Sequence, residues 1–176
     1  PAAPVHLHLA EQVAEVTEVQ AAYGARPVEW LLQQGLVDAR WCLIHATQMT
    51  PAETLGLAAT GAVAGLCPIT EANLGDGIFD AARYLDAGGR FGIGSDSNVR
   101  IAMAEELRLL EYGQRLRDKG RAVLATPDRS TGRVLYEGTV LGGAQAAGRA
   151  SGAIRVGDFA DLVALDSRAV DLEGRA

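Results

Sequence analysis

The sequence predicts an α/β fold in which a parallel sheet is covered by helices. Its short strand-like segments are apolar throughout, which is typical of strands that are buried on both faces. Each is followed by a stretch with helical spacing of its apolar residues, and this unit occurs four times. Right-handed crossovers between parallel strands place such helices over the sheet. The 176 residues, 18.4 kDa in mass, suffice for one domain with at most a small appendage.

The expected elements follow from where the apolar runs begin and end. Strands are expected at 4–10, 41–46, 62–68 and 90–94, and helices at 11–24, 28–34, 50–61, 78–87, 101–117 and 136–147. The third helix has the clearest start, because Thr50 suits the N-cap, Pro51 the first position and Glu53 a capping box. The apolar stripe expected on the helix at 101–117 consists of Met103, Leu107, Leu110 and Leu116.

Three segments are expected not to be helical. Residues 118–133 are polar and rich in turn formers, so we expect a loop there, and the pattern within 152–165 indicates two short strands around a turn. Residues 67–77 also hold many turn formers, and they form either a long connecting loop or a loop that contacts a substrate. Glycines at 88–94 precede and occupy a strand, so they are weak evidence for a nucleotide site.

Charge and composition exclude several partners. The chain has 16 basic and 22 acidic residues, a net charge of −6 and no run of Lys or Arg, so nucleic acid is not expected to bind. No apolar stretch approaches the ~20 residues that span a bilayer, so no membrane segment is expected. Cys42 and Cys67 lie in apolar runs and are expected to be buried reduced thiols, which favours a cytoplasmic protein. Because the chain begins at Pro1 and not at Met, we interpret it as a processed piece or a fragment.

The three histidines, His6, His8 and His45, all lie in predicted apolar strands. Buried imidazole needs a hydrogen-bond partner or a metal, so each is either a satisfied core residue or a functional one. Alternation along a strand puts His6 and His8 on the same face. His8 and His45 lie near the carboxyl ends of their strands, and Glu11 and Asp96 follow strand ends. Functional groups of α/β folds gather at these ends.

Asp96, within the GSDS motif at 94–97, has two interpretations. It is either the N-cap of the helix that follows or an oxygen ligand and proton acceptor. Zinc in catalytic sites usually takes three protein ligands and keeps one position for water. One histidine and one aspartate are too few, so the visible set of ligands is incomplete.

Several motifs together resemble a known family. The chain resembles the second half of the amidohydrolase superfamily, in its deaminase branch, through HLAE at 8–11, the strand-ending His45 and SD at 95–96. Within this branch, segments 6–12, 43–47, 67–77 and 94–97 are most similar to the formimidoylglutamate deiminase family, and 67–77 is the most specific of them. The tail, with GGA at 142–144 and GDFADL at 157–162, resembles the superfamily's return to a small β-sandwich.

The resemblance implies a role for each of four residues. His8 is implied to be a metal ligand and Glu11 a proton shuttle. His45 is implied to lie beside the attacking water, while Asp96 both binds the metal and accepts a proton. One Zn²⁺ per site is implied, with Fe²⁺ or another divalent ion as the alternative. The His-x-His pair that supplies two further ligands in the family has no counterpart here, because the motif order assigns the pair at 6–8 to a later strand.

The resemblance also implies a fold and an activity. The chain is expected to be the C-terminal half, about strands 5–8, of a (β/α)8 TIM-like metallo-hydrolase barrel. Residues 1–150 are expected to form the half barrel and 151–176 the start of the β-sandwich. The implied parent is a homodimer that acts on a small-molecule substrate, by hydrolytic deamination of N-formimino-L-glutamate to N-formyl-L-glutamate and ammonia in histidine degradation.

Two alternatives stay open. One is another deaminase of the same branch, of the guanine, cytosine or triazine type, although an aromatic content of 5% disfavours stacking of a flat base. The other is an inactive truncated fragment or a non-catalytic paralogue. An isolated half barrel leaves sheet edges unpaired and an apolar face uncovered, so we expect it to be inactive and either aggregated or dimeric.

Overall fold

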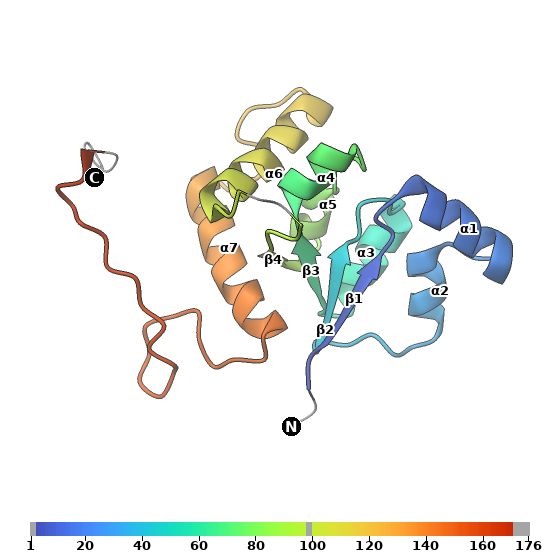
Figure 1. Ribbon diagram of the computed structural model, residues 1–176, viewed down its shortest axis with the longest axis horizontal. Helices are drawn as coiled ribbons and strands as arrows, with labels where there is room; N and C mark the ends of the chain where they lie inside the picture. The colour runs from blue at the N-terminus through green and yellow to red at the C-terminus, as the bar shows by residue number, and fades with distance from the viewer. Residues whose placement is uncertain (1–2, 98–99, 171–176) are drawn as a thin grey trace.

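Four parallel strands form the centre of the protein. The computed structural model describes residues 3–97 and 100–170 and pairs the strands in the order β1-β2-β3-β4. They are β1 (Val5–Leu9), β2 (Trp41–His45), β3 (Val63–Leu66) and β4 (Arg90–Ile93), as Figure 1 shows. The parallel α/β fold predicted from the sequence is therefore confirmed, and each predicted strand is present in its place.

Seven helices connect and cover the strands within the described residues. They are α1 (Val13–Tyr23), α2 (Pro27–Gln33), α3 (Pro51–Ala59), α4 (Pro68–Leu74), α5 (Ala81–Asp86), α6 (Met103–Asp118) and α7 (Thr131–Ala146). Two starts differ from the expected ones by three residues or more, and a side-chain cap explains each. Asp80 caps α5 by accepting from Arg83 N, which places the start after the expected one. Ser130 caps α7 by accepting from Arg133 N, so that helix begins five residues before 136.

The expectation of a loop throughout 67–77 is wrong, because α4 lies within this segment. Pro68 occupies the first turn of the helix, where its missing N–H is not needed. Gly75 ends the helix in the left-handed conformation, with φ 74°. The residues that indicate turns in the sequence are thus the start and stop signals of a short helix.

The capping box expected at the start of α3 is confirmed. Glu53 N donates to Thr50 Oγ1 at 3.2 Å, and Thr50 N donates to Glu53 Oε2 at 2.7 Å. The Glu53 carboxylate is buried and also accepts from Arg26 Nε at 2.9 Å and from Glu29 N at 3.2 Å. A single carboxylate therefore joins the starts of α2 and α3.

The main core lies between the sheet and helices α3, α5 and α6. Its largest fully buried apolar members are Tyr84, Phe79, Phe91, Leu43, Leu57 and Leu66. Leu43 on β2, Leu66 on β3 and Phe91 on β4 follow the alternation of their strands to this one face. The buried strand pattern recognised in the sequence thus forms the contact surface for the helices.

The apolar stripe expected on α6 is wrong in part. Leu107 and Leu110 are buried as expected, but Met103 and Leu116 are exposed. The buried face of α6 holds polar residues instead, because they satisfy backbone groups of neighbouring segments. Glu106 accepts from Ile69 N, Glu111 accepts from Val123 N and Leu124 N, and Gln114 donates to Phe79 O.

Helix α7 packs closely against β4 (Figure 1). Gly94 N donates to Leu66 O on β3, so by alternation the backbone groups of Phe91 point away from β3. Gly142 lies directly against them, since a Cβ added there would stand 1.9 Å from Phe91 O. Glycine is therefore what lets the helix approach the strand this closely.

A second, smaller cluster lies on the opposite face of the sheet. Ala146 at the end of α7 packs there with Cys42 and Val63, whereas Leu135 near the start of α7 belongs to the main core. Both cysteines are free and buried, as predicted. Burial raises the pKa of Cys42 to about 11 and that of Cys67 to about 12, so both stay thiols at neutral pH.

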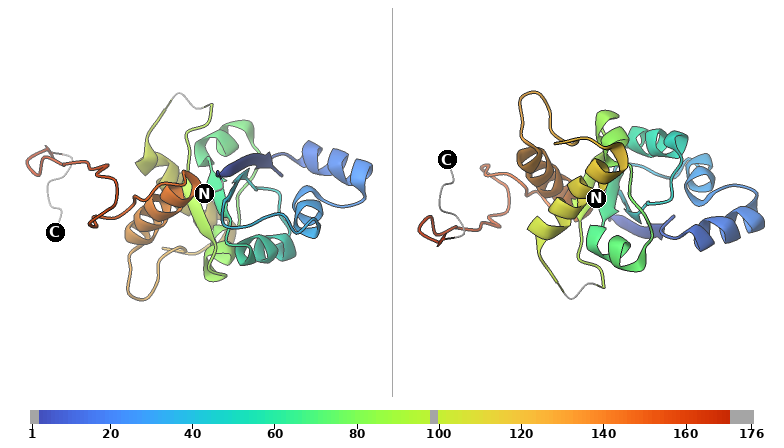
Figure 2. Two further views of the ribbon diagram at one scale, coloured as in Figure 1. Left: turned by 90° about the horizontal axis from the view of Figure 1, so that it is seen from below. Right: turned by 90° about the horizontal axis from the view of Figure 1, so that it is seen from above.

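The two short strands expected within 152–165 are not formed. Residues 151–170 contain no strand and extend away from the helices, as the dark orange and red segment of Figures 1 and 2 shows. Ile154 is 89% exposed and Val163 is 87% exposed. A strand needs a neighbour to satisfy its backbone groups, and no described strand lies beside this segment. The division at 150/151 remains a prediction.

Among the described residues, no helix combines the length and apolar character needed to cross a membrane.

Gly142→Ala tests the packing of α7 on β4. The added methyl meets a strand backbone, so we expect the free energy of unfolding to fall by about 1–3 kcal/mol. Gly143→Ala is the matched control, because nothing lies within 4 Å of its Cβ position. There the gain in helix propensity is expected to raise stability by roughly 0.5–1 kcal/mol. Urea unfolding followed by circular dichroism measures both, and equal effects of the two substitutions contradict this packing.

Glu53→Gln tests the carboxylate that joins α2 and α3. Burial by itself raises the pKa of Glu53, but hydrogen bonds from Thr50 and Arg26 outweigh it and hold the pKa below its usual value. The stabilisation is therefore present above the pKa that Glu53 has in the unfolded chain. It is lost as the pH falls through the pKa that Glu53 has in the folded protein. We expect the variant to be less stable by roughly 1.5–3 kcal/mol at neutral pH. The difference in free energy of unfolding between wild type and variant should narrow below about pH 4. A difference that stays constant with pH contradicts this role.

Candidate metal centre and active site

Three of the residues singled out in the sequence meet at the carboxyl end of the sheet. His8 lies near the end of β1, Glu11 follows that strand, and His45 is the last residue of β2. Each offers a ligand atom, and these atoms all lie within 4.8 Å of one another. The rings of His8 and His45 stand 5.0 Å apart, edge to face. The predicted gathering of these side chains at one end of the sheet is therefore observed.

The backbone at these strand ends adopts an uncommon conformation. Positive φ angles occur at Ala10 (51°), His45 (67°), Ala46 (49°) and Asp96 (47°), although none of these residues is glycine. In a regular strand His45 would share the face of Leu43, which belongs to the main core. With its left-handed backbone it lies beside His8 instead. Such strain persists where the surroundings fix it, and it concentrates at functional sites.

Hydrogen bonds from neighbouring segments fix these turns. Ala46 N donates to Leu9 O and Gln48 N to Ala10 O, which ties the end of β2 to the end of β1. On the other side, Ala10 N and Glu11 N each donate to the carboxylate of Glu15, at 2.7 and 2.8 Å. No motif in the sequence singles out Glu15. It supports the site only by accepting hydrogen bonds from backbone N–H groups, which every residue type but proline can supply.

His45 is fully buried, and among the described residues its ring has one hydrogen-bond partner. Its Nδ1 lies 3.2 Å from Glu71 Oε1. Its Nε2 is buried without a hydrogen-bond partner among the described residues and lies 3.6 Å from Glu11 Oε1. Burial lowers the pKa of His45, but the bond to Glu71 and the nearby carboxylates outweigh burial, so the pKa lies above its usual value.

Glu11 is partly buried and lies beside His8 and His45 at the carboxyl end of the sheet. Burial, helped by the charges of Asp76 and Asp96, raises its pKa above the usual value, while His45 and His8 oppose that rise. A carboxyl group with a raised pKa holds a proton more readily near neutral pH. Glu11 is thus suited to carry a proton to a reacting group.

Asp96 lies at the same site but outside the group of three. It follows β4 and lines the cavity that His8, Glu11 and His45 border. The interpretation of Asp96 as the N-cap of the following helix is wrong, because α6 begins at Met103 and its N-cap residue is Ala102. The place of Asp96 at the cavity is compatible with the ligand and proton-acceptor role.

The cavity at this end of the sheet has a volume of about 430 Å³. Residues of α4 form part of its wall, so the segment 67–77 does reach the rim, as a helix and not as a loop. The lining residues are His8, Glu11, Gln12, His45, Thr70, Asn73, Leu74, Asp96 and Ser97.

The residues of this cluster fit a divalent metal ion. Imidazole nitrogens and a carboxylate oxygen are the donors that zinc takes in catalytic sites. The ligand atoms of His8, Glu11 and His45 lie within 4.8 Å of one another, and His45 Nε2 is 3.6 Å from Glu11 Oε1. The buried and unpartnered Nε2 also calls for a ligand or a water on that side.

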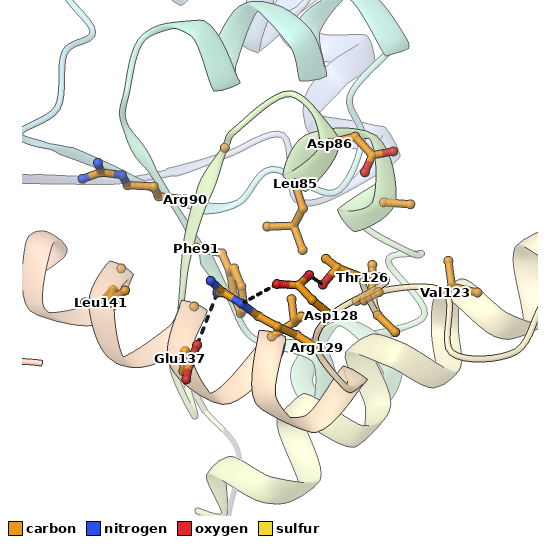
Figure 3. Close-up of a pocket in the computed structure, with 17 residues that line it drawn as sticks. Leu85, Asp86, Arg90, Phe91, Val123, Thr126, Asp128, Arg129, Glu137 and Leu141 are labelled. Atoms are coloured by element: carbon orange, nitrogen blue, oxygen red, sulfur yellow. Dashed lines mark hydrogen bonds and ion pairs between the residues drawn. The ribbon is translucent and has the colours of Figure 1, made fainter. Parts of the chain in front are cut away.

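A second, larger cavity lies elsewhere, between α5, β4, the segment 119–130 and α7 (Figure 3). Its volume is about 630 Å³, and its wall includes apolar side chains such as Leu85, Phe91 and Leu141. Arg129 there is paired with Asp128 and Glu137. It holds no histidine or cysteine, and we therefore assign the chemistry to the smaller cavity.

Residues 2–174 match the model of the amidohydrolase family. The chain belongs to this family. The resemblance seen in the short motifs is thereby confirmed across nearly the whole chain.

The chain is similar to several deaminases. It is 56% identical over 164 residues, 93% of its length, to the formimidoylglutamate deiminase of Pseudomonas aeruginosa, of which it covers 36%. It is 30% identical to the 5-methylthioadenosine/S-adenosylhomocysteine deaminase of Pyrococcus furiosus, over 94% of the chain and 39% of that relative. This amidohydrolase chain thus spans little more than a third of the length of these relatives.

Solved structures of the family have the same fold. An amidohydrolase from Brucella melitensis is 61% identical, with a TM-score of 0.81 over 83% of this chain and 33% of its own. An adenosine deaminase from Xanthomonas campestris with bound zinc is 32% identical, with a TM-score of 0.86 over 98% of this chain and 39% of its own. The zinc in that neighbour agrees with the divalent-metal donors of the cluster.

His8→Ala tests the metal centre in the protein at its natural length. We expect the substitution to weaken Zn²⁺ binding roughly tenfold or more, because it removes an imidazole donor. His6→Ala is the matched control: it lies on the same strand, but its Nε2 is bonded to Ala146 O at 2.9 Å. Competition with a chromophoric chelator gives both affinities. Equal weakening by the two substitutions, or none by either, contradicts the assigned site.

Proposed function

We propose that the chain is the C-terminal half of a (β/α)8 barrel enzyme that hydrolyses N-formimino-L-glutamate to N-formyl-L-glutamate and ammonia. The observation that carries this proposal is the 56% identity over 93% of the chain to a formimidoylglutamate deiminase. The four parallel strands, with His8, Glu11, His45 and Asp96 around one cavity, support it.

We further propose that the enzyme holds one zinc ion, with His8 and Asp96 among its ligands. Zinc lowers the pKa of water, so that hydroxide becomes available near neutral pH. Two ligands from this chain are fewer than the three usual in catalytic zinc sites, so the remaining ligands come from another part of the parent.

The carboxylates of this chain move the protons in the proposed reaction. Asp96 takes a proton from the attacking water, whose oxygen bonds to the formimino carbon. Glu11 delivers a proton to the terminal nitrogen, which becomes an amino group. The proton held by Asp96 then passes to this nitrogen as the C–N bond breaks and ammonia leaves, while the hydroxyl proton returns to Glu11 as the formyl C=O bond forms. The raised pKa of Glu11 supports this role, and His45 Nε2 is placed to hydrogen-bond the attacking water.

Deamination of a flat base is the second candidate, because relatives and structural neighbours include nucleoside deaminases and triazine hydrolases. Recognition of a base uses stacking on aromatic side chains. The described wall of the cavity contains no Phe, Tyr or Trp, and it offers Gln12, Thr70, Asn73 and Ser97 as polar groups. The formimino substrate is therefore the better fit to this part of the site.

Ammonia release from N-formimino-L-glutamate, by the protein at its natural length, tests the proposal. Glu11→Gln and Asp96→Asn are each expected to lower kcat by about 10²–10⁴-fold, because each removes a proton carrier. Glu18→Gln, on the exposed side of α1, is the control and should leave the rate unchanged.

Wild-type-like rates for either active-site variant contradict the proposed roles. Turnover of adenosine or 5-methylthioadenosine, with none of N-formimino-L-glutamate, favours the second candidate. A folded protein that turns over neither class contradicts both candidates and favours the non-catalytic alternative.

A further inference from the structure

We infer that Glu71 is a positioning residue that fixes the ring and the tautomer of His45, so that the lone pair of Nε2 faces the cavity. None of the sequence motifs gives Glu71 this role. The inference concerns the side chains of this chain alone and does not depend on the substrate of the proposed reaction.

The contact between the two side chains is enclosed. Glu71 is 3% exposed and His45 is 0% exposed. Glu71 Oε1 lies 3.2 Å from His45 Nδ1 and also accepts from Cys67 N at 3.0 Å. In a buried setting, a hydrogen bond of this kind strongly favours one orientation of the ring, because a buried polar group without a partner is destabilising.

The partners of Glu71 Oε1 decide which ring nitrogen holds the proton. This oxygen already acts as an acceptor toward the Cys67 N–H. It therefore also accepts from His45, and Nδ1 is the donor. A neutral imidazole has a single N–H, so the other nitrogen, Nε2, carries a lone pair.

The lone pair of Nε2 faces a second acceptor. Nε2 is buried without a hydrogen-bond partner among the described residues, and Glu11 Oε1 lies 3.6 Å away. Two acceptors that face each other need a hydrogen-bond donor or a cation between them. A water molecule or a divalent ion meets this need, which agrees with the donor set of the cluster.

Helix α4 holds Glu71 rigidly in place. At the start of the helix, Ile69 N donates to the buried carboxylate of Glu106 at 2.8 Å. At its end, Gly75 N and Asp76 N both donate to Glu71 O. His45 has a left-handed backbone, which persists only when its surroundings over-determine it. The bond from α4 is one of the contacts that do so.

Nitrogen-15 NMR of the histidine side chains tests the inference directly. The spectra are recorded on the protein at its natural length, and the resonances that disappear in His45→Gln are those of His45. In the metal-free protein, at a pH where the rings are neutral, we expect His45 to show a protonated Nδ1 and an unprotonated Nε2. A protonated Nε2 overturns the inference, and this measurement on the wild-type protein decides even if a Glu71 variant fails to fold.

Two substitutions separate positioning from general support of α4. Glu71→Met removes the acceptor, so we expect the ring of His45 to become a mixture of the Nδ1–H and Nε2–H tautomers. Glu71→Gln keeps an amide oxygen in place and is expected to restore it. Glu106→Met removes another buried carboxylate that caps α4 and should leave the His45 shifts in place. Unchanged His45 shifts in Glu71→Met, or equal changes in Glu106→Met, overturn the inference.

These spectra are recorded without substrate and without metal. A wrong tautomer therefore leaves the proposed deamination standing, and absence of deamination leaves the role of Glu71 standing.

Discussion

Parallel pairing of the four strands is the constraint on which the site depends. In a parallel sheet every strand ends at the same edge, so segments that follow β1, β2 and β4 meet there although they are far apart in the sequence. His8, Glu11, His45 and Asp96 each belong to a strand end or to the residues just after it. An antiparallel arrangement of the same strands would send neighbouring strand ends to opposite edges of the sheet.

Buried and half-buried carboxylates then turn this gathering into a defined geometry. Glu15 holds the backbone after β1, and Glu71 holds the ring of His45. Glu53 and Glu106 accept backbone hydrogen bonds at the starts of α3 and α4. Each carboxylate accepts from backbone N–H groups that would otherwise be buried without partners. The acidic character of the chain is thus partly structural, since several of its carboxylates replace missing backbone partners at helix starts and strand ends.

Local signals predict the strands, most helix starts and the chemistry of the strand ends. The capping box at Thr50 and the His8–Glu11 spacing need only a few neighbouring residues to be recognised. Helix α4 is not predictable in this way, because its proline and glycine also suit a loop. Glu71 meets His45 only through the fold, 26 residues apart. The left-handed backbone of His45 leaves no sequence pattern, since non-glycine residues rarely adopt it.

The carboxyl end of this sheet is, on the proposal made above, the metal centre of a hydrolase. Anomalous diffraction at the zinc edge, from crystals of the protein at its natural length, locates the ion. We expect one peak in the cavity, with a His8 nitrogen and an Asp96 oxygen within about 2.2 Å of the ion. A peak bound only by residues elsewhere, or an empty cavity in zinc-saturated crystals, would rule out this metal centre.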